Sequence, residues 1–325
     1  MVNTYLNFTG RQTIEIAREK VWASPIGAEE LRGHTLYTLI SAGTELNASF
    51  LDVFNWGYPK KSGYTAVFRV DEVGESVKGY KPGDLVFCMG AHQSCQSVHH
   101  TGAIKIPDNV APEDALYIRM AGVSMATFSR TRVPTGEKLM VMGLGPVGHM
   151  AARVYSALGY EVIAVERDEG RRKILSERLP VPVFKTVPRD NPEYYKQIAL
   201  ALDCTGSEAA VFDCCDMVRP HGEVSLVGVP WKRMSDLDAH RLTHSIFYNY
   251  VTLYGGWEMD LPRESSQFNP MSMNRNYRLA LKLIADGTID VSGLNRIRPY
   301  TEGQEAFEAI MNRTEPMLAT VLSWQ

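Results

Sequence analysis

A glycine-rich turn between a strand pattern and a helix pattern restricts the fold more than any other feature of this sequence. Residues 138–142 are mostly apolar and end at a glycine, as a buried parallel strand does. Apolar side chains then recur at helical spacing over residues 147–158, and Gly159 follows where a C-terminal cap belongs. A second apolar run covers residues 162–165. The pattern predicts a βαβ unit over residues 138–165.

The turn has the glycine spacing of a dinucleotide-binding loop, and it consists of Gly143, Leu144, Gly145, Pro146, Val147 and Gly148. The first glycine permits a tight turn, the second lets a pyrophosphate approach the backbone, and the third lets the helix pack on the strand. The helix N-terminus offers N–H groups to the phosphate. A purely structural turn is the alternative interpretation, but the strand before it and the helix after it favour a dinucleotide site.

The choice between NAD and NADP depends on the end of the second strand. Glu166 stands where an acid accepts hydrogen bonds from the adenosine ribose, and a carboxylate repels a 2′-phosphate. Arg167 and Arg171 could offset that repulsion, or they could flank the adenine without choosing between the two cofactors. We therefore expect NAD, with NADP as the open alternative.

Strand and helix patterns continue to alternate after this unit, whereas the first 130 residues look different. The later segments are strands at 198–202, 224–227 and 251–254 and a helix at 208–218 capped by Ser207. This alternation predicts a doubly wound parallel sheet over residues 131–264. The first 130 residues contain short extended segments between Gly and Pro turns, at 35–40, 66–73, 85–89 and 103–106, and predict a β-rich domain. Beyond residue 264 we expect helices at 277–285 and 304–311 and a strand at 318–322.

The composition excludes several classes of partner. The chain has 325 residues, 45% of them hydrophobic, and a formal net charge of -3, so no basic excess exists to bind nucleic acid. No apolar run approaches the ~20 residues that a membrane span requires. Five cysteines in a sequence without a secretory signal favour reduced thiols and a cytoplasmic location.

The order of these parts resembles the medium-chain dehydrogenase/reductase superfamily. The matching landmarks are Ile-Ser-Ala-Gly-Thr-Glu at 40–45, residues 73–84, Asp-Cys-Thr-Gly at 203–206 and residues 219–224. The resemblance implies a GroES-like β-rich catalytic domain of residues 1–130 and 265–325 and a Rossmann dinucleotide-binding domain of residues 131–264. It also implies hydride transfer between an alcohol or carbonyl and a nicotinamide.

The same resemblance adds residues to the cofactor site and suggests an assembly. Cys204, Thr205, Gly228 and Val229 fall on positions that line the cofactor in this superfamily. Its frequent dimers join edge strands of the nucleotide domains, so we expect a homodimer or higher homo-oligomer, with residues 251–254 as the candidate edge.

The positions of the catalytic zinc ligands are the point where this chain departs from zinc-dependent members. Where they have a cysteine, a histidine and an acid or cysteine, this chain has Ala42, Tyr64 and Arg119, none of them an ordinary zinc ligand. The four-cysteine lobe of the structural zinc is absent as well. The sequence thus resembles the zinc-free branch, and its Ser-x-Gly-Thr-Glu stretch is similar to bacteriochlorophyllide dehydrogenase relatives, which does not identify the substrate.

A second metal interpretation comes from a crowded segment. Cys88, His92, Cys95, His99 and His100 lie within thirteen residues, which suggests a zinc site. The Cys-x6-Cys spacing is not that of the usual short knuckle, and the segment reads as a strand, a turn and another β segment. We therefore expect no metal here, but a buried free cysteine and surface histidines.

Without zinc, the protein itself must supply cationic or hydrogen-bonding groups at the reacting oxygen. Thr44 falls on the hydroxyl that binds the substrate alcohol in this family, Tyr64 offers a phenol, and Arg119 a permanent charge. His92 is the alternative acid or base, and we expect Glu45 to brace the site. Structural roles stay open: a turn hydroxyl for Thr44, core packing for Tyr64, a domain–domain salt bridge for Arg119 and a loop position for His92.

Aromatic residues around these segments could pack in the core or between subunits, or some could form a flat platform for a ring. The second interpretation favours a cyclic secondary alcohol, such as a sugar or cyclitol, as the substrate. These aromatic residues are Trp56, Tyr58, Trp231, Phe247, Tyr248, Tyr250, Tyr254 and Trp257. The sequence thus predicts a zinc-independent, NAD(H)-preferring alcohol dehydrogenase or ketone reductase. The alternatives are an NADPH-dependent quinone or enone (C=C) reductase and a catalytically silent protein that senses a dinucleotide by binding it.

Overall fold

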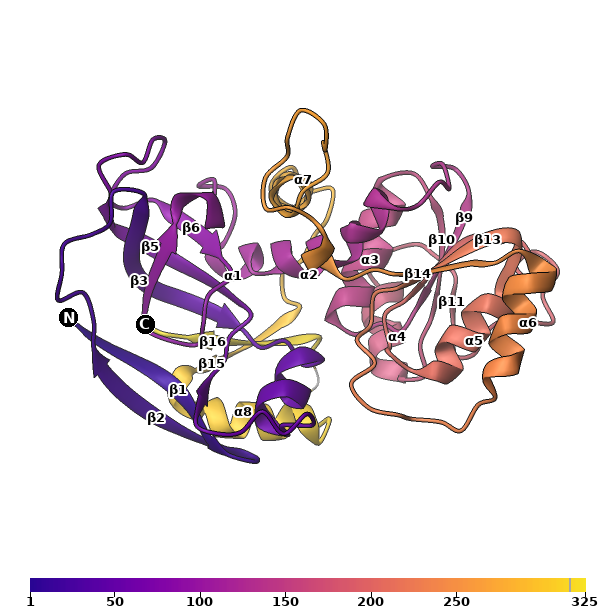
Figure 1. Ribbon diagram of the computed structural model, residues 1–325, viewed down its shortest axis with the longest axis horizontal. Helices are drawn as coiled ribbons and strands as arrows, with labels where there is room; N and C mark the ends of the chain where they lie inside the picture. The colour runs from indigo at the N-terminus through magenta and orange to yellow at the C-terminus, as the bar shows by residue number, and fades with distance from the viewer. Residues whose placement is uncertain (316) are drawn as a thin grey trace. The chain divides into compact units, whose positions relative to one another are not determined.

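Two units share the chain in a computed structural model, which describes residues 1–315 and 317–325 (Figure 1). The first unit contains Met1–Arg119, Tyr277–Gly287 and Val291–Gln325, and the second contains Met120–Asn276 and Thr288–Asp290. The chain therefore leaves the first unit after Arg119, returns to it at Tyr277, and passes briefly through the second unit again at Thr288–Asp290. The divisions fall near residues 119 and 277 rather than 130 and 265, because they lie within helices α2 (Tyr117–Met125) and α7 (Met273–Ala285), where no turn signal marks them.

A six-stranded parallel sheet forms the centre of the second unit. Its strands are β9 (Lys138–Met142), β10 (Glu161–Val165), β11 (Val183–Phe184), β12 (Ile198–Asp203), β13 (Val218–Leu226) and β14 (Thr252–Gly255). Their order is β11-β10-β9-β12-β13-β14, and every neighbouring pair is parallel. The first strand thus lies beside the fourth, so the order reverses between β9 and β12, where open α/β sheets bind ligands at the carboxyl ends.

Helices cover both faces of this sheet, which confirms the doubly wound architecture. They are α3 (Pro146–Ala157), α4 (Glu169–Ser176), α5 (Glu208–Met217) and α6 (Ala239–Asn249). Figure 1 shows α3 and α4 on one face and α5 and α6 on the other. Met140, Ile163 and Ala201 of the strands pack with Cys214 of α5 in one buried core. The expected helix 208–218 ends one residue early, because Val218 is already extended and begins β13.

The first unit is built from short helices and from strands that pair antiparallel, except for the parallel pair β15 and β16. A seven-stranded sheet has the order β15-β16-β3-β5-β6-β8, with β7 paired to β3, and a three-stranded sheet has the order β2-β1-β4. The larger sheet contains β3 (Glu30–Leu39), β5 (Thr65–Val73), β6 (Leu85–Cys88), β7 (Cys95–His99), β8 (Ala103–Lys105), β15 (Asn295–Pro299) and β16 (Ala319–Ser323). The smaller contains β1 (Val2–Gly10), β2 (Thr13–Lys20) and β4 (Lys60–Lys61).

The β1–β2 hairpin was not expected from the sequence, because polar residues occupy most of its length. Only a few of its side chains, Leu6 and Phe8 among them, enter the core, where Phe8 and Phe50 contact Phe307 of helix α8 (Gly303–Met311). This unit also contains the single turn α1 (Pro112–Ala115), the π-helical segment η1 (Leu46–Phe50), the 3-10 turns η2 (His100–Gly102) and η5 (Tyr300–Glu302), and most of α7. Among the described residues, no helix combines the length and apolar character needed to cross a bilayer.

Candidate functional site

The glycine loop joins β9 to α3 at the carboxyl edge of the sheet, and its three glycines have different surroundings. Gly143 has a φ of +88°, a left-handed conformation that favours glycine. A Cβ on Gly148 would lie 1.8 Å from the Gly143 carbonyl oxygen, so only glycine lets the helix approach the loop. A Cβ on Gly145 would meet only Arg171 Nη1, at 4.0 Å. The space beside Gly145 is open, as an approaching phosphate requires.

The start of α3 provides a place for an anion. Pro146 and Val147 open the helix, and Gly145 is its N-cap residue, which has no side chain to satisfy the first N–H groups. Pro146 suits the first helical turn because its missing N–H would have no partner there. These N–H groups and the positive end of the helix dipole favour a negatively charged ligand.

Glu166 follows β10 and turns its carboxylate back toward the glycine loop. Its Oε2 accepts a hydrogen bond of 2.7 Å from the Leu144 N–H, and its Oε1 accepts one of 2.9 Å from the Asp168 N–H. Arg171 Nη1 lies 3.8 Å from the same Oε2. The carboxylate therefore braces the loop, and its remaining lone pairs stay available to a ribose. Bracing was not part of the sequence interpretation, because the i to i+22 contact leaves no local signal.

The two arginines near Glu166 differ in exposure. Arg167 is exposed, whereas Arg171 is half-buried in the first turn of α4. A third arginine, Arg172, donates to the carbonyl oxygens of Glu166 and Arg167 at 2.9 and 2.7 Å and fixes this turn. Arg171 thus lies between the carboxylate of Glu166 and the space beside Gly145, where it can meet a phosphate group.

The loop after β12 packs against the end of β13 around a buried aspartate. Asp203 accepts hydrogen bonds from the Thr205 N–H, the Thr205 hydroxyl and the Gly206 N–H. Its own carbonyl oxygen accepts from the N–H of Gly228 at 2.7 Å. Cys204 is half-buried, and Thr205 and Val229 are exposed. Burial and the neighbouring Asp203 carboxylate raise the pKa of the Cys204 thiol, so this thiol is a weak nucleophile at neutral pH.

In the first unit, Tyr64 and Arg119 form a stacked pair. The guanidinium carbon of Arg119 lies 3.5 Å from the centre of the Tyr64 ring, and Arg119 Nη1 donates to the Tyr64 carbonyl oxygen. Arg119 is 6% exposed, whereas Tyr64 is half-buried. The structure therefore brings together two residues that are 55 positions apart. Thr44, also half-buried, begins the segment that leads through Glu45 into η1.

His92 and Glu45 form a buried pair near the same segment. His92 Nε2 lies 3.0 Å from Glu45 Oε1, and both side chains are almost fully enclosed. The other oxygen, Glu45 Oε2, accepts from the Ser41 N–H at 2.8 Å, while the Ser62 hydroxyl donates to Oε1 at 2.7 Å. Burial favours a higher pKa, but His92 and these hydrogen bonds together hold the pKa of Glu45 below its ordinary value.

The pair extends to the C-terminal end of the chain. His92 Nδ1 shares a hydrogen bond of 2.8 Å with the Thr38 hydroxyl, to which Trp324 Nε1 donates at 3.0 Å. Both ring nitrogens of His92 thus face protein groups. Glu45 holds the backbone of Ser41, three residues before Thr44, which is the bracing arrangement expected of it. Sequence spacing could not reveal Thr38, Ser62 and Trp324, because strand pairing joins them.

The fold directs the cysteine and histidine side chains of residues 88–100 to different places. Cys88 and Cys95 are buried free thiols, and His92 points into the network above. His99 and His100 are on the surface at the end of β7, beside Glu29. The five residues therefore do not surround one point.

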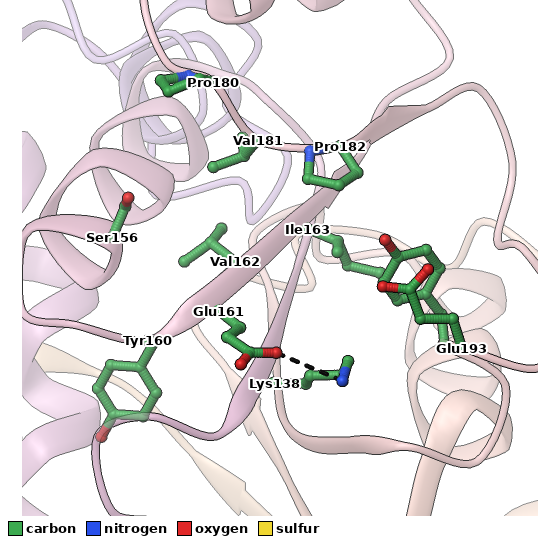
Figure 2. Close-up of a pocket in the computed structure, with 11 residues that line it drawn as sticks. Lys138, Ser156, Tyr160, Glu161, Val162, Ile163, Pro180, Val181, Pro182 and Glu193 are labelled. Carbon is green, nitrogen blue, oxygen red and sulfur yellow. Dashed lines mark ion pairs between the residues drawn. The ribbon is translucent and has the colours of Figure 1, made fainter.

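A pocket of about 320 Å³ lies at the opposite edge of the second unit's sheet (Figure 2). Lys138 and Glu161 are the first residues of β9 and β10, and they form an ion pair of 3.3 Å in its wall. Ser156 of α3 and the segment Pro180–Pro182 complete part of the lining. None of the expected site residues lines this pocket, because the glycine loop follows the other ends of the same strands.

Comparison with known proteins gives a consistent picture. The sequence model of a family described as zinc-binding dehydrogenase matches residues 146–273. Sorbitol dehydrogenase of Homo sapiens is 26% identical over 79% of this chain and 81% of that enzyme. L-threonine 3-dehydrogenase of Escherichia fergusonii is 24% identical over 67% and 77%. The crystal structure of galactitol-1-phosphate dehydrogenase from Escherichia coli superposes with a TM-score of 0.81 at 17% identity, covering 98% of this chain and 99% of that one.

Proposed function

Because the chain belongs to the medium-chain dehydrogenase/reductase superfamily, we propose that it is a zinc-independent dehydrogenase acting with NAD(H) on a secondary alcohol or ketone. The observation that carries this proposal is the stacked Tyr64–Arg119 pair. A buried guanidinium beside a phenol would supply charge and a hydroxyl at two positions that, by the family resemblance, correspond to zinc ligands. The residues do not fit a catalytic zinc, because Ala42 offers no ligand atom and Arg119 repels a dication.

The residues of the second unit fit a dinucleotide. The open space beside Gly145 and the N-terminus of α3 would hold the pyrophosphate, with Thr205, Gly228 and Val229 nearby. Glu166 would bind the adenosine ribose with the lone pairs that the loop leaves free, which favours NAD. Arg171, 3.8 Å from Glu166, would partly offset the repulsion between Glu166 and the 2′-phosphate of NADP, but the preference for NAD would remain. The cofactor, when bound, supplies or accepts the hydride at its nicotinamide ring.

The residues of the first unit would handle the substrate oxygen. Arg119 stabilises negative charge that develops on this oxygen, and the Tyr64 hydroxyl donates or accepts the proton. Thr44 offers a second hydroxyl. We assign His92 to positioning, because its nitrogens face Glu45 and Thr38. The contact between His92 and Glu45 would hold the segment 41–45, which contains Thr44, in place.

A cyclic or open-chain polyol is the substrate class that we propose. Sorbitol dehydrogenase and galactitol-1-phosphate dehydrogenase are among the similar proteins. Near Thr44 in the sequence, the Trp56 ring is 68% exposed and lies 5.4 Å from the Phe54 ring. Exposed aromatic faces of this kind suit the C–H faces of a sugar ring.

Turnover separates this proposal from its two alternatives. We expect NADH formation from at least one member of a panel of polyols and cyclitols, unchanged after dialysis against a chelator. Oxidation of NADPH by quinones or enones, with no alcohol turnover, would instead support a C=C reductase. Tight NAD binding with no turnover in either panel would support the dinucleotide-sensing protein. Activity that disappears with the chelator and returns with zinc would refute zinc independence.

We also propose that the protein is a cytoplasmic homodimer. All five cysteines are free thiols, which suits a reducing compartment. β14 is an outermost strand of its sheet, with one set of backbone groups available for another strand. Sedimentation velocity should give twice the mass of one chain, and Leu253→Pro in β14 should shift the protein to monomers. A monomer at all concentrations would refute the assembly.

A further inference from the structure

Three potential metal ligands converge on the surface of the first unit. They are a carboxylate oxygen of Glu29, a ring nitrogen of His99 and a ring nitrogen of His100, all within 4.8 Å of one another. His99 Nε2 lies 3.5 Å from Glu29 Oε2, and His100 Nε2 lies 3.9 Å from Glu29 Oε1. The two imidazole rings are 4.7 Å apart at an angle of 31°. Both histidines therefore direct Nε2 toward one carboxylate.

The backbone fixes this arrangement. β3 and β7 are antiparallel, and Glu30 pairs with His99 in their register. One residue beyond, the His100 N–H donates to the Glu29 carbonyl oxygen at 2.9 Å. The start of β3 and the end of β7 therefore lie side by side, and the backbone keeps the three residues adjacent.

Thr101 orients the His99 ring. The Thr101 hydroxyl lies 2.8 Å from His99 Nδ1, while the Thr101 N–H lies 3.3 Å from the same nitrogen. Because Nδ1 accepts from the Thr101 N–H, the neutral ring carries its proton on Nε2, which faces Glu29. A cation that binds Nε2 displaces this proton, and a proton on Nδ1 can then be donated to the Thr101 hydroxyl. Histidines that bind metals commonly donate their other ring N–H to such an oxygen, and this fixes the ring.

We propose that Glu29, His99 and His100 form a binding site for a divalent cation of the zinc class. Imidazole and carboxylate are ordinary zinc ligands, and tetrahedral zinc keeps its ligand atoms about 3.4 Å apart. The present separations, all within 4.8 Å, need to close by up to about 1.4 Å, which exposed side chains can do: Glu29 is 61%, His99 50% and His100 33% exposed. Three protein ligands leave the fourth position to water.

Such a site has a structural consequence rather than a catalytic one. Its residues are not among those proposed to contact the cofactor or the substrate. A bound cation would join the entry of β3 to the exit of β7 and neutralise the carboxylate between the two imidazoles. It would therefore stabilise the first unit by mass action.

Zinc titration of the metal-free protein tests the proposal. Isothermal titration calorimetry with Zn²⁺ at pH 7.5 should give one tight site per chain, and zinc should raise the Tm. The double variant His99→Ala/His100→Ala should lose this binding, and Glu29→Gln should weaken it at least tenfold. These residues are exposed, so the variants should fold, which circular dichroism and NADH binding check.

Two control variants identify the source of any binding. His34→Ala removes an exposed histidine of β3 that pairs with Asp71 at 2.9 Å. His240→Ala/His244→Ala removes the other histidine pair, spaced one turn apart on α6. Both controls should bind zinc as the parent does. The proposal is overturned if zinc binding survives loss of His99 and His100, if it disappears with the α6 pair, or if no saturable binding occurs.

Discussion

The guanidinium carbon of Arg119 lies 3.5 Å from the centre of the Tyr64 ring, and Arg119 also donates to the Tyr64 carbonyl oxygen. These contacts hold a buried positive charge against the aromatic face while leaving the phenolic oxygen at the far end of the ring. The pair comes from α2 and from the segment before β5, so it depends on the folded first unit. Substitutions can test the two residues one at a time, because Arg119 donates to the main-chain carbonyl oxygen of Tyr64 and this contact does not depend on the Tyr64 side chain.

Arg119→Met should lower kcat by roughly 10²-fold, equivalent to ~3 kcal/mol, because one preorganised charge at the reacting oxygen is lost. NAD affinity should hardly change, since the cofactor residues belong to the second unit. Steady-state kinetics and NADH titration measure the two effects. Arg32→Met is the matched control, since Arg32 is also buried and binds the carbonyl oxygens of Ser24 and Pro25. Equal losses in both variants would mean that Arg119 acts only through the fold.

Tyr64→Phe should reduce kcat and change its pH profile, because the variant keeps the ring and the carbonyl that Arg119 contacts but loses the hydroxyl. We expect a loss of about 10²-fold if the hydroxyl transfers the proton. Tyr80→Phe serves as the control, since it removes a tyrosine hydroxyl that donates to the Ala103 carbonyl oxygen and is not among the groups proposed to contact the substrate. A Tyr64→Phe enzyme with the parent's rate and pH profile would assign Tyr64 to packing.

Glu166→Ala should reduce NAD affinity by ~1–3 kcal/mol while NADP affinity holds or rises, because the substitution removes a ribose acceptor and a repulsive charge together. Fluorescence titration with NADH and NADPH measures both affinities. Glu169→Ala, on the exposed first turn of α4, should change neither. Parallel loss of both cofactors would instead show that the 2.7 Å contact with the Leu144 N–H is the only role of Glu166.

The glycines at 145 and 148 should respond differently to alanine. Gly148→Ala places a Cβ 1.8 Å from the Gly143 carbonyl oxygen, so it should destabilise the protein by about 1–3 kcal/mol or more. Gly145→Ala meets no atom closer than 4.0 Å and should fold normally, yet bind NADH at least tenfold more weakly. Urea unfolding and NADH titration separate the effects. Normal NADH binding by Gly145→Ala would place the pyrophosphate elsewhere.

Glu45→Gln should make the free energy of unfolding depend less on pH in the acidic range. The pKa of Glu45 is lowered in the folded protein, so its contribution is present above the ordinary value of 4.5 and is lost as the pH falls through the folded value. At pH 7 the variant should be less stable by about 1–3 kcal/mol, and this difference should shrink below pH 4.5. Urea unfolding at pH 7 and pH 4 measures it. A difference independent of pH would mean that the carboxylate does not exchange its proton in this range.

Local patterns in the sequence determined the nucleotide-binding unit. The strand, glycine loop and helix of residues 138–165 occupy adjacent stretches of chain, so their order and spacing record the geometry directly. The sequence assigned the third glycine to close packing of the helix on the loop. The structure agrees, because a Cβ on Gly148 would lie 1.8 Å from the Gly143 carbonyl oxygen. Family resemblance added the expected order of the two domains.

Tertiary structure alone decided which distant side chains meet. Tyr64 and Arg119, His92 and Glu45, and Glu29 with His99 and His100 are brought together by strand pairing and by the return of the chain. The register of an antiparallel sheet relates residues tens of positions apart, and no periodicity along the chain encodes it. His92 shows the difference: its sequence neighbours suggested a loop or a catalytic base, whereas the pairing of β strands encloses it between a carboxylate and the Thr38 hydroxyl.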